Sequence, residues 1–240
     1  MPTLTETRLE LHTDSTLPLD ECLIGIVTVQ AGSQAVRVSA RLNLIEGDLT
    51  ITVTGTAGYS ARCAWPWPVD AQGRATDLAP GQRLVGAVPL VGTDSGTPLF
   101  PSTGAYTLVA EYDVVPGERL TSTAITVHRT PGQDAARTAA LRDRDVIQSL
   151  LSASLLGGAA AGLHAIADGT QVTSRMLAAL ALDQAEPVAA AAISDQAEAD
   201  VAAAIEAVLP AGVADADPRR VALHARVSRA TSPTGSPSLP

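Results

Sequence analysis

The chain has 240 residues, of which 46% are apolar and 2% aromatic, so any core must be built from many small contacts between alanine, leucine and valine. Its 16 basic residues are all arginine, and against 25 acidic residues they leave a formal charge of -9. This balance argues against a nucleic-acid partner, which requires a basic surface, and deep aromatic pockets are not expected.

Residues 4 to 130 are predicted to form short strands separated by turns, because apolar and polar residues alternate along much of this stretch. The most regular alternation runs from Val36 to Leu44, and it resumes at Leu49 after the turn Glu46-Gly47-Asp48. Gly55 to Gln82 is rich in Gly, Pro, Asp and Ala and is predicted to be mainly loop. Further strands are expected at residues 9–11, 23–29, 84–90 and 120–128, the last with Thr123, Ile125 and Val127 facing inward. About seven strands with no helix between them favour an antiparallel β-sandwich.

The stretch Leu99 to Tyr112 is predicted to form a strand with a defined corner at its start. Tyr106, Leu108, Ala110 and Tyr112 recur at every second position, which places them on one face of a strand, and that face is expected to lie in the core. Gly104 stands two residues before Tyr106, at the start of the strand. This spacing predicts a tyrosine corner, in which the phenol hydroxyl bonds to backbone just upstream.

Two segments carry a resemblance to a known family: Leu78-Ala-Pro-Gly-Gln-Arg-Leu84 and Phe100-Pro-Ser-Thr-Gly-Ala-Tyr-Thr-Leu-Val-Ala110, the latter followed by a thin strand. Together they resemble the bacterial immunoglobulin-like domains found in adhesive, accessory and intracellular proteinase-inhibitor proteins. The resemblance covers about half of the chain and implies a binding or structural module. Leu108 occupies the place of an antibody domain's second cysteine, so no disulfide between the sheets is expected there.

Beyond the linker Thr130-Pro131-Gly132, the apolar period changes from two to 3.6 residues, which predicts helices. A first helix is expected from Asp143 to Leu156, ending at Gly157-Gly158. The remaining expected helices are residues 159–167, a helix capped by Thr173 or Ser174 and closed by Pro187, one or two alanine-rich helices over 189–209, and a last helix from Asp217-Pro218 to about Arg229.

The predicted fold class is therefore α+β with segregated domains. Residues 1–130 are expected to form an immunoglobulin-like antiparallel β-sandwich, and residues 134–229 an alanine-rich helical domain. Residues 230–240, rich in Ser, Pro and Thr, are expected to be a disordered tail.

The segment Trp65-Pro66-Trp67-Pro68 is the candidate partner-binding site, because it holds both tryptophans of the chain within a few residues. Its prolines exclude ordinary sheet pairing, so we expect it to be a loop. Two interpretations remain open at this point. The segment either plugs an open end of the sandwich or is an exposed hot spot for a protein partner, where tryptophan is enriched.

No residues are predicted to carry catalysis or to bind a cofactor or a metal. Asp94-Ser95-Gly96 resembles the nucleophile segment of chymotrypsin-like proteases, but only His12 precedes Ser95, so a loop is expected instead. The four histidines lack ligand spacing, and Cys22 and Cys63 are expected to be buried thiols, with a pair on facing strands as the alternative. No phosphate-binding loop or dinucleotide fingerprint occurs.

Two further patterns have structural explanations. The apolar run Ile147 to Ala167 is interrupted by polar residues and by Gly157-Gly158, so we expect a soluble helical hairpin rather than a membrane helix, with His164 on a helix face. Carboxylates in the helical half are expected to lie in first turns of helices: Asp143, Asp145, Asp195, Glu198 and Asp200.

The function expected from these patterns is a non-enzymatic protein–protein interaction or scaffold module, cytoplasmic or associated with an assembly. The cytoplasm is expected because the first ten residues hold neither a basic leader nor an apolar run. The partner is expected to be another protein or a second copy, since narrow alanine-rich helix surfaces bury little area each and self-association would complete their core. The alternative is a proteinase-inhibitor-like module that blocks a partner enzyme through loops of the sandwich.

Overall fold

A computed structural model describes residues 6–40, 42–44, 48–65, 75–115, 117–183, 185–190 and 192–193. The strands in this part of the chain are β1 (Arg8–His12), β2 (Thr16–Pro18), β3 (Leu23–Gln30), β4 (Val36–Ser39), β5 (Leu49–Gly55), β6 (Ser60–Cys63), β7 (Ala75–Leu78), β8 (Arg83–Leu90), β9 (Gly104–Val115), β10 (Glu118–Thr121) and β11 (Ile125–Thr130). The helices are η1 (Thr56–Gly58), α1 (Ala135–Ala140), α2 (Arg144–Ser152), α3 (Ala160–Ala167) and α4 (Val172–Leu182).

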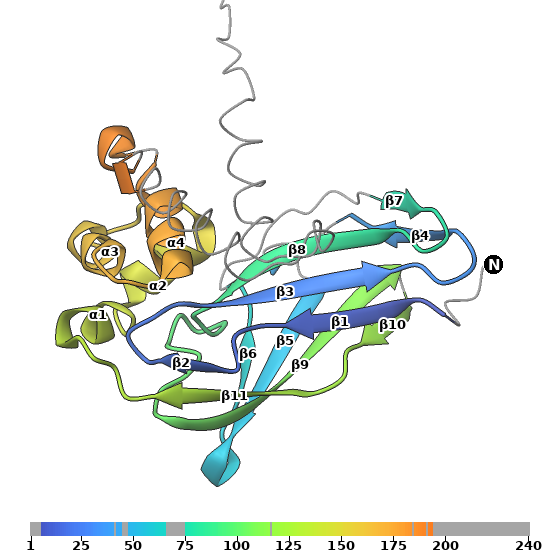
Figure 1. Ribbon diagram of the computed structural model, residues 1–240, viewed down its shortest axis with the longest axis horizontal. Coiled ribbons are helices and arrows are strands. Elements are labelled where there is room, and N and C mark those ends of the chain that lie inside the picture. Colours follow the sequence, from blue (N-terminus) through green and yellow to red (C-terminus); the bar gives the residue numbers. More distant parts are fainter. Residues whose placement is uncertain are drawn as a thin grey trace, which may run out of the picture.

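Two sheets pack face to face to form a sandwich (Figure 1). One has the order β1-β3-β8, and the other has the order β2-β11-β9-β5-β6 with β10 also beside β9. The consecutive strands β1 and β2 lie in different sheets, β1 antiparallel to β3 and β2 parallel to β11. Strands β1, β3 and β8 thus take the places of A, B and E, and β5, β9 and β11 those of C, F and G, which makes the sandwich immunoglobulin-like.

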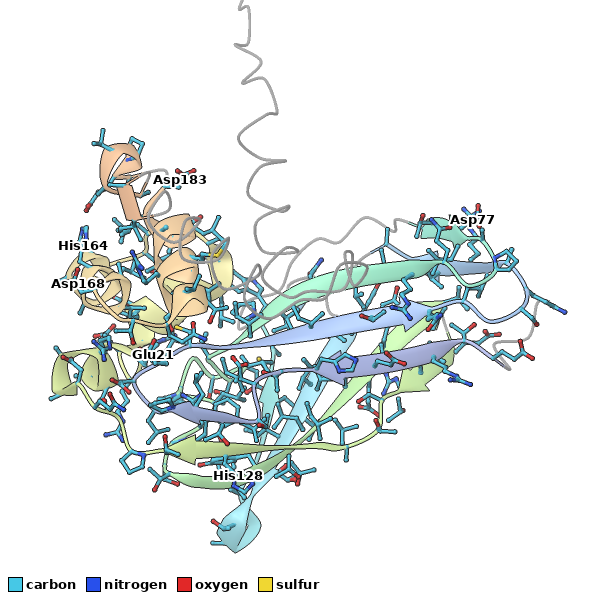
Figure 2. The ribbon with its side chains drawn as sticks, in the orientation of Figure 1. Glu21, Asp77, His128, His164, Asp168 and Asp183 are labelled. Atoms are coloured by element: carbon cyan, nitrogen blue, oxygen red, sulfur yellow. The ribbon has the colours of Figure 1, made fainter. Side chains whose placement is uncertain are left out.

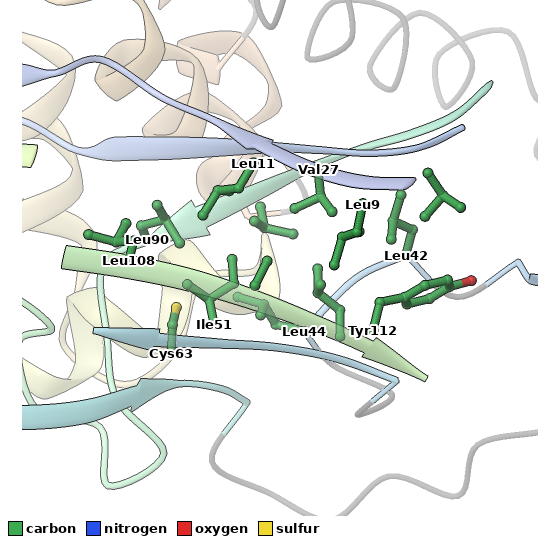
Figure 3. Packing of buried hydrophobic residues seen from close by; sticks show 14 of the residues in the cluster. Leu9, Leu11, Val27, Leu42, Leu44, Ile51, Cys63, Leu90, Leu108 and Tyr112 are labelled. Carbon is green, nitrogen blue, oxygen red and sulfur yellow. The ribbon is translucent and has the colours of Figure 1, made fainter. Parts of the chain in front are cut away.

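Strand β9 lies at the centre of the larger sheet and supplies the middle of the core. Tyr106, Leu108, Ala110 and Tyr112 are all buried, which confirms the face predicted from their period of two. Side chains from the opposite sheet, such as Leu11 and Val27, meet them across the sandwich (Figure 3). The core is therefore aliphatic, with few aromatic rings, as the composition predicts.

The regular alternation from Val36 to Leu44 predicted one long strand, and this was wrong. Strand β4 ends at Ser39, and Leu42 and Leu44 reach the core from outside any strand. A Cβ atom added to Gly86 of β8 would lie 2.4 Å from the Leu42 carbonyl oxygen, so the chain passes very close to β8 here. The alternation predicted the burial of both valines and both leucines correctly, but Ala40 of the same predicted face is exposed. Buried residues at every second position therefore do not require a continuous strand. Residues 46 and 47 of the predicted turn lie outside the described residues.

Two other strand predictions need correction. The stretch predicted as loop, Gly55 to Gln82, contains the short strands β6 and β7. The strand predicted over residues 120–128 is divided into β10 and β11, and Thr123 is exposed rather than inside. The division occurs at Ser122, whose Oγ accepts a hydrogen bond from the Ala110 amide at 3.0 Å.

The α-helices follow the strands along the chain, in agreement with an α+β protein. Asp143 caps α2 with its side chain, as expected of a carboxylate there, but the helix ends at Ser152 because Ala153 takes a left-handed conformation with φ of 50°. Helix α4 is capped by Gln171 and not by Thr173 or Ser174, since the Gln171 side chain accepts from both of their amides. The predicted helices beyond residue 193 and the tail lie outside the described residues.

Candidate functional site

The helices lie against one end of the sandwich, opposite the end that carries β4 and β7 (Figure 1). A second apolar core fills this contact, and it combines Cys22 and Val91 of the sandwich with Leu141, Ile147 and other helical residues. We call this region the junction. A Cβ atom on Gly92 would lie 2.4 Å from Ile147 Cγ2, so α2 approaches the sandwich backbone closely. The helices are thus packed onto the sandwich rather than tethered to it.

The candidate partner-binding segment begins at this junction. Cys63, the last residue of the edge strand β6, is fully buried, and Trp65 two residues later is half-buried against the helical core. Pro66, Trp67 and Pro68 lie outside the described residues. The structure therefore places the first tryptophan between the sandwich and the helices, and the position of Trp67 stays a prediction.

An ionic cluster of Asp20, Glu21, Arg129 and Arg137 ties the two parts together beside the apolar junction. Arg137 of α1 lies 2.8 Å from Asp20 Oδ2 and 3.8 Å from Glu21 Oε1, both in the loop that leads into β3. The Asp134 amide also donates to Asp20 at 3.0 Å. Both carboxyl groups are buried, and Figure 2 shows Glu21 where this loop meets the helices. Such pairs fix geometry more than they add stability, because burial removes the hydration of each charge.

Arg129 of β11 anchors the same loop from the sandwich side. Its Nη2 donates to the carbonyl oxygens of Pro18 and Glu21, each at 2.8 Å. Its guanidinium carbon lies 5.1 Å from the centre of the Phe100 ring, in a cation–π arrangement. Burial lowers the pKa of Arg129 to about 10, and it remains a cation at neutral pH. The loop carrying Asp20 and Glu21 is thus held by an arginine on each side.

The pKa values of the two buried carboxyl groups shift in opposite directions. Burial raises the pKa of Glu21 above its usual range, although hydrogen bonding from Ser174 and the charge of Arg137 oppose this rise. Burial also acts to raise the pKa of Asp20, but hydrogen bonds from the Gln133 backbone, Arg137 and the Asp134 backbone outweigh it and hold the pKa low. Asp20 is therefore the ionised partner of Arg137, and Glu21 is the more readily protonated of the two.

Sequence reasoning did not identify this cluster. Asp20 and Arg137 are 117 positions apart, and the two arginines occur in segments with no distinctive motif. Periodicity places residues on faces of single elements, but it does not report which elements meet. The one local signal is Asp134, an N-cap residue whose side chain accepts from the Arg137 amide and so orients the first turn of α1.

The other residues considered for chemistry have structural partners. Ser95 lies in a turn, where its hydroxyl meets those of Thr93 at 2.8 Å and Thr97 at 3.2 Å. His164 Nε2 lies 2.7 Å from Glu186 Oε2. Cys22 and Cys63 are buried free thiols, and burial raises the pKa of each to about 12. In the part of the chain that the structure describes, no cluster of His, Cys, Asp and Glu could hold a metal ion.

None of the described helices combines the length and the apolar character needed to cross a membrane.

Comparisons with known proteins give little beyond this geometry. No protein-family model matches the chain, and no curated protein matches it. Among solved structures, the solution structure of the CARDB domain of PF1109 from Pyrococcus furiosus is similar at 13% identity and a TM-score of 0.28. The similarity covers 52% of this chain and 94% of that chain. A likeness of this extent adds nothing to what the strand topology shows.

Proposed function

We propose that this chain is a non-enzymatic interaction or scaffold module that binds another protein, or a second copy of itself, through the segment Trp65-Pro66-Trp67-Pro68. The observation that carries the proposal is the placement of Trp65. Trp65 follows the edge strand β6 and packs, partly buried, against the core formed with the helices.

The energetics of the segment support the same function. Each proline fixes its own φ and restricts the residue before it, so the segment loses little conformational freedom when it is immobilised on a partner. Tryptophan is enriched among the residues that dominate binding energy. A loop of this composition beside a rigid junction suits recognition of a protein surface.

The cytoplasm is the proposed location. The two cysteines are compatible with it, because both are buried and unpaired and a reducing compartment preserves free thiols.

Photo-crosslinking tests the proposal. A photoreactive phenylalanine analogue is placed at position 67 of the whole chain, and a second variant carries it at Thr123, an exposed position between β10 and β11. With purified protein, position 67 should give a covalent dimer, or with native-host extract one discrete heterologous product, while position 123 gives neither. Equal products at both positions, or reaction of position 67 only with its own chain, would refute the proposed site.

A further inference from the structure

The ionic cluster contains buried polar atoms that no described residue satisfies. Among them are Nε and Nη1 of Arg129 and Oε2 of Glu21, in residues that are each 5% exposed. Arg129 uses Nη2 for both of its carbonyl contacts, so the remaining donors of the guanidinium are free for another acceptor. Buried donors and acceptors are seldom left unpaired in folded proteins, because each has given up its hydrogen bonds to solvent.

A small cavity is lined by the two residues that carry these atoms, Glu21 and Arg129. Its volume is about 20 Å³, and apolar side chains from both sides of the junction also line it. The sandwich contributes Val91 and Phe100, and the helical part contributes Leu141. A single water needs about 10 to 15 Å³ of free volume, so this cavity has room for one water and for little else.

We infer that the cavity is a binding site for one ordered water molecule, which accepts a hydrogen bond from the Arg129 guanidinium and bonds to the Glu21 carboxyl group. Water fits the chemistry because it both donates and accepts, as these two partners require. A halide could accept from Arg129 but would lie beside the Glu21 carboxyl group, which also lines the cavity. A metal ion would gain carboxylate oxygens but would meet the cationic Arg129.

The water has a structural consequence for the junction. It links β11, through Arg129, to the loop that carries Glu21, and that loop is held from the helical side by Arg137. The water therefore adds a second link to the direct hydrogen bonds by which Arg129 already holds this loop, beside the apolar contact of Gly92 with Ile147. Internal waters of this kind typically make about three hydrogen bonds and are costly to remove.

A crystal structure of the whole chain at about 1.5 Å resolution, with a second crystal soaked in bromide, tests the site. The expected result is one density peak within hydrogen-bond distance of both Arg129 and Glu21, without anomalous bromide signal. Bromide at this position would assign an anion site and overturn the inference. So would side chains that close the cavity and pair with each other directly.

Substitutions distinguish loss of the water from loss of folding. Arg129→Met removes the donors and should abolish the peak, whereas Arg137→Met changes an arginine of the same cluster that does not line the cavity and should retain it. If Arg129→Met fails to fold, Val91→Ile serves instead, because its added methylene fills the cavity and should expel the water. A peak that survives Val91→Ile unchanged, or that disappears in Arg137→Met alone, contradicts the assignment.

Discussion

The Tyr106 hydroxyl donates to the Ser102 carbonyl at 2.8 Å and closes the turn that leads into β9. Its ring packs edge-on against Phe100, with 5.1 Å between the ring centres. Tyr106→Phe should keep this packing and cost about 1 to 2 kcal/mol of unfolding free energy, because the Ser102 carbonyl loses its partner. Chemical denaturation measures the change. Ser102→Ala, which keeps the carbonyl, should cost less, and an unchanged midpoint in Tyr106→Phe would show that the hydroxyl bond contributes nothing.

Glu21 gives a prediction about pH at the same scale. Burial raises its pKa in the folded protein above the ordinary value of 4.5, so the folded state favours the protonated form. The stability that this group contributes is present below pH 4.5 and is lost as the pH rises through the folded pKa. Glu21→Gln should therefore be more stable than the parent at pH 7 to 8, with the difference shrinking towards pH 4. Denaturation midpoints across this range measure it, and a variant that is less stable at every pH would contradict it.

Asp20 should behave in the opposite sense. Hydrogen bonds from the Gln133 backbone and Arg137 outweigh burial and hold its pKa below the ordinary value of 3.8, so its contribution is present above pH 3.8 and is lost as the pH falls through the folded pKa. Asp20→Asn should cost about 3 to 5 kcal/mol at neutral pH, because it leaves the charge of Arg137 without its closest partner. The same denaturation series measures this loss. A cost that persists unchanged at pH 2 would point to packing rather than charge.

At the scale of elements, local chemistry decided which predictions succeeded. The face of β9 and the cap of α2 at Asp143 depend on neighbours along the chain, and both were predictable. Leu42 passes close over Gly86 beyond the end of β4, and the cap of α4 comes from Gln171 rather than from the more common capping residues beside it. The first feature is a contact between segments distant in sequence, and the second uses a residue type with a weak capping preference. Neither can be predicted from the residue pattern of one segment.

The close contact between Gly92 and α2 can be tested by substitution. Gly92→Ala should destabilise the protein by about 1 to 3 kcal/mol, because the added methyl group would overlap Ile147 in a packed core. Gly158→Ala is the matched control, since a Cβ there meets nothing nearer than the Asp145 Oδ2 atom at 3.9 Å. Thermal or chemical unfolding distinguishes the two variants. Equal stabilities would mean that α2 does not press on the sandwich as the structure indicates.

On the scale of the whole molecule, two apolar cores meet at the junction, and one cluster of buried charges lies beside their contact. The change of period near residue 130 predicted where strands give way to helices. It could not predict that Cys22 and Val91 would join the helical core, because no local pattern reports contacts between residues so far apart. The division into domains at 1–130 and 134–229 stays a prediction, since the buried junction couples the two parts.

The binding role of the Trp65–Pro68 segment is the central claim, and Trp67→Ala in the whole chain tests it most directly. Unfolding free energy and association, measured by sedimentation over a range of concentrations, are compared with those of the parent and of Trp65→Ala. The account predicts that Trp67→Ala changes stability by less than about 0.5 kcal/mol and weakens association by about 2 kcal/mol or more. Trp65 packs against the helical core, so Trp65→Ala should instead lower the unfolding free energy of the protein. A loss of about 3 to 5 kcal/mol of stability in Trp67→Ala, with association unchanged, would return Trp67 to the core and contradict the account.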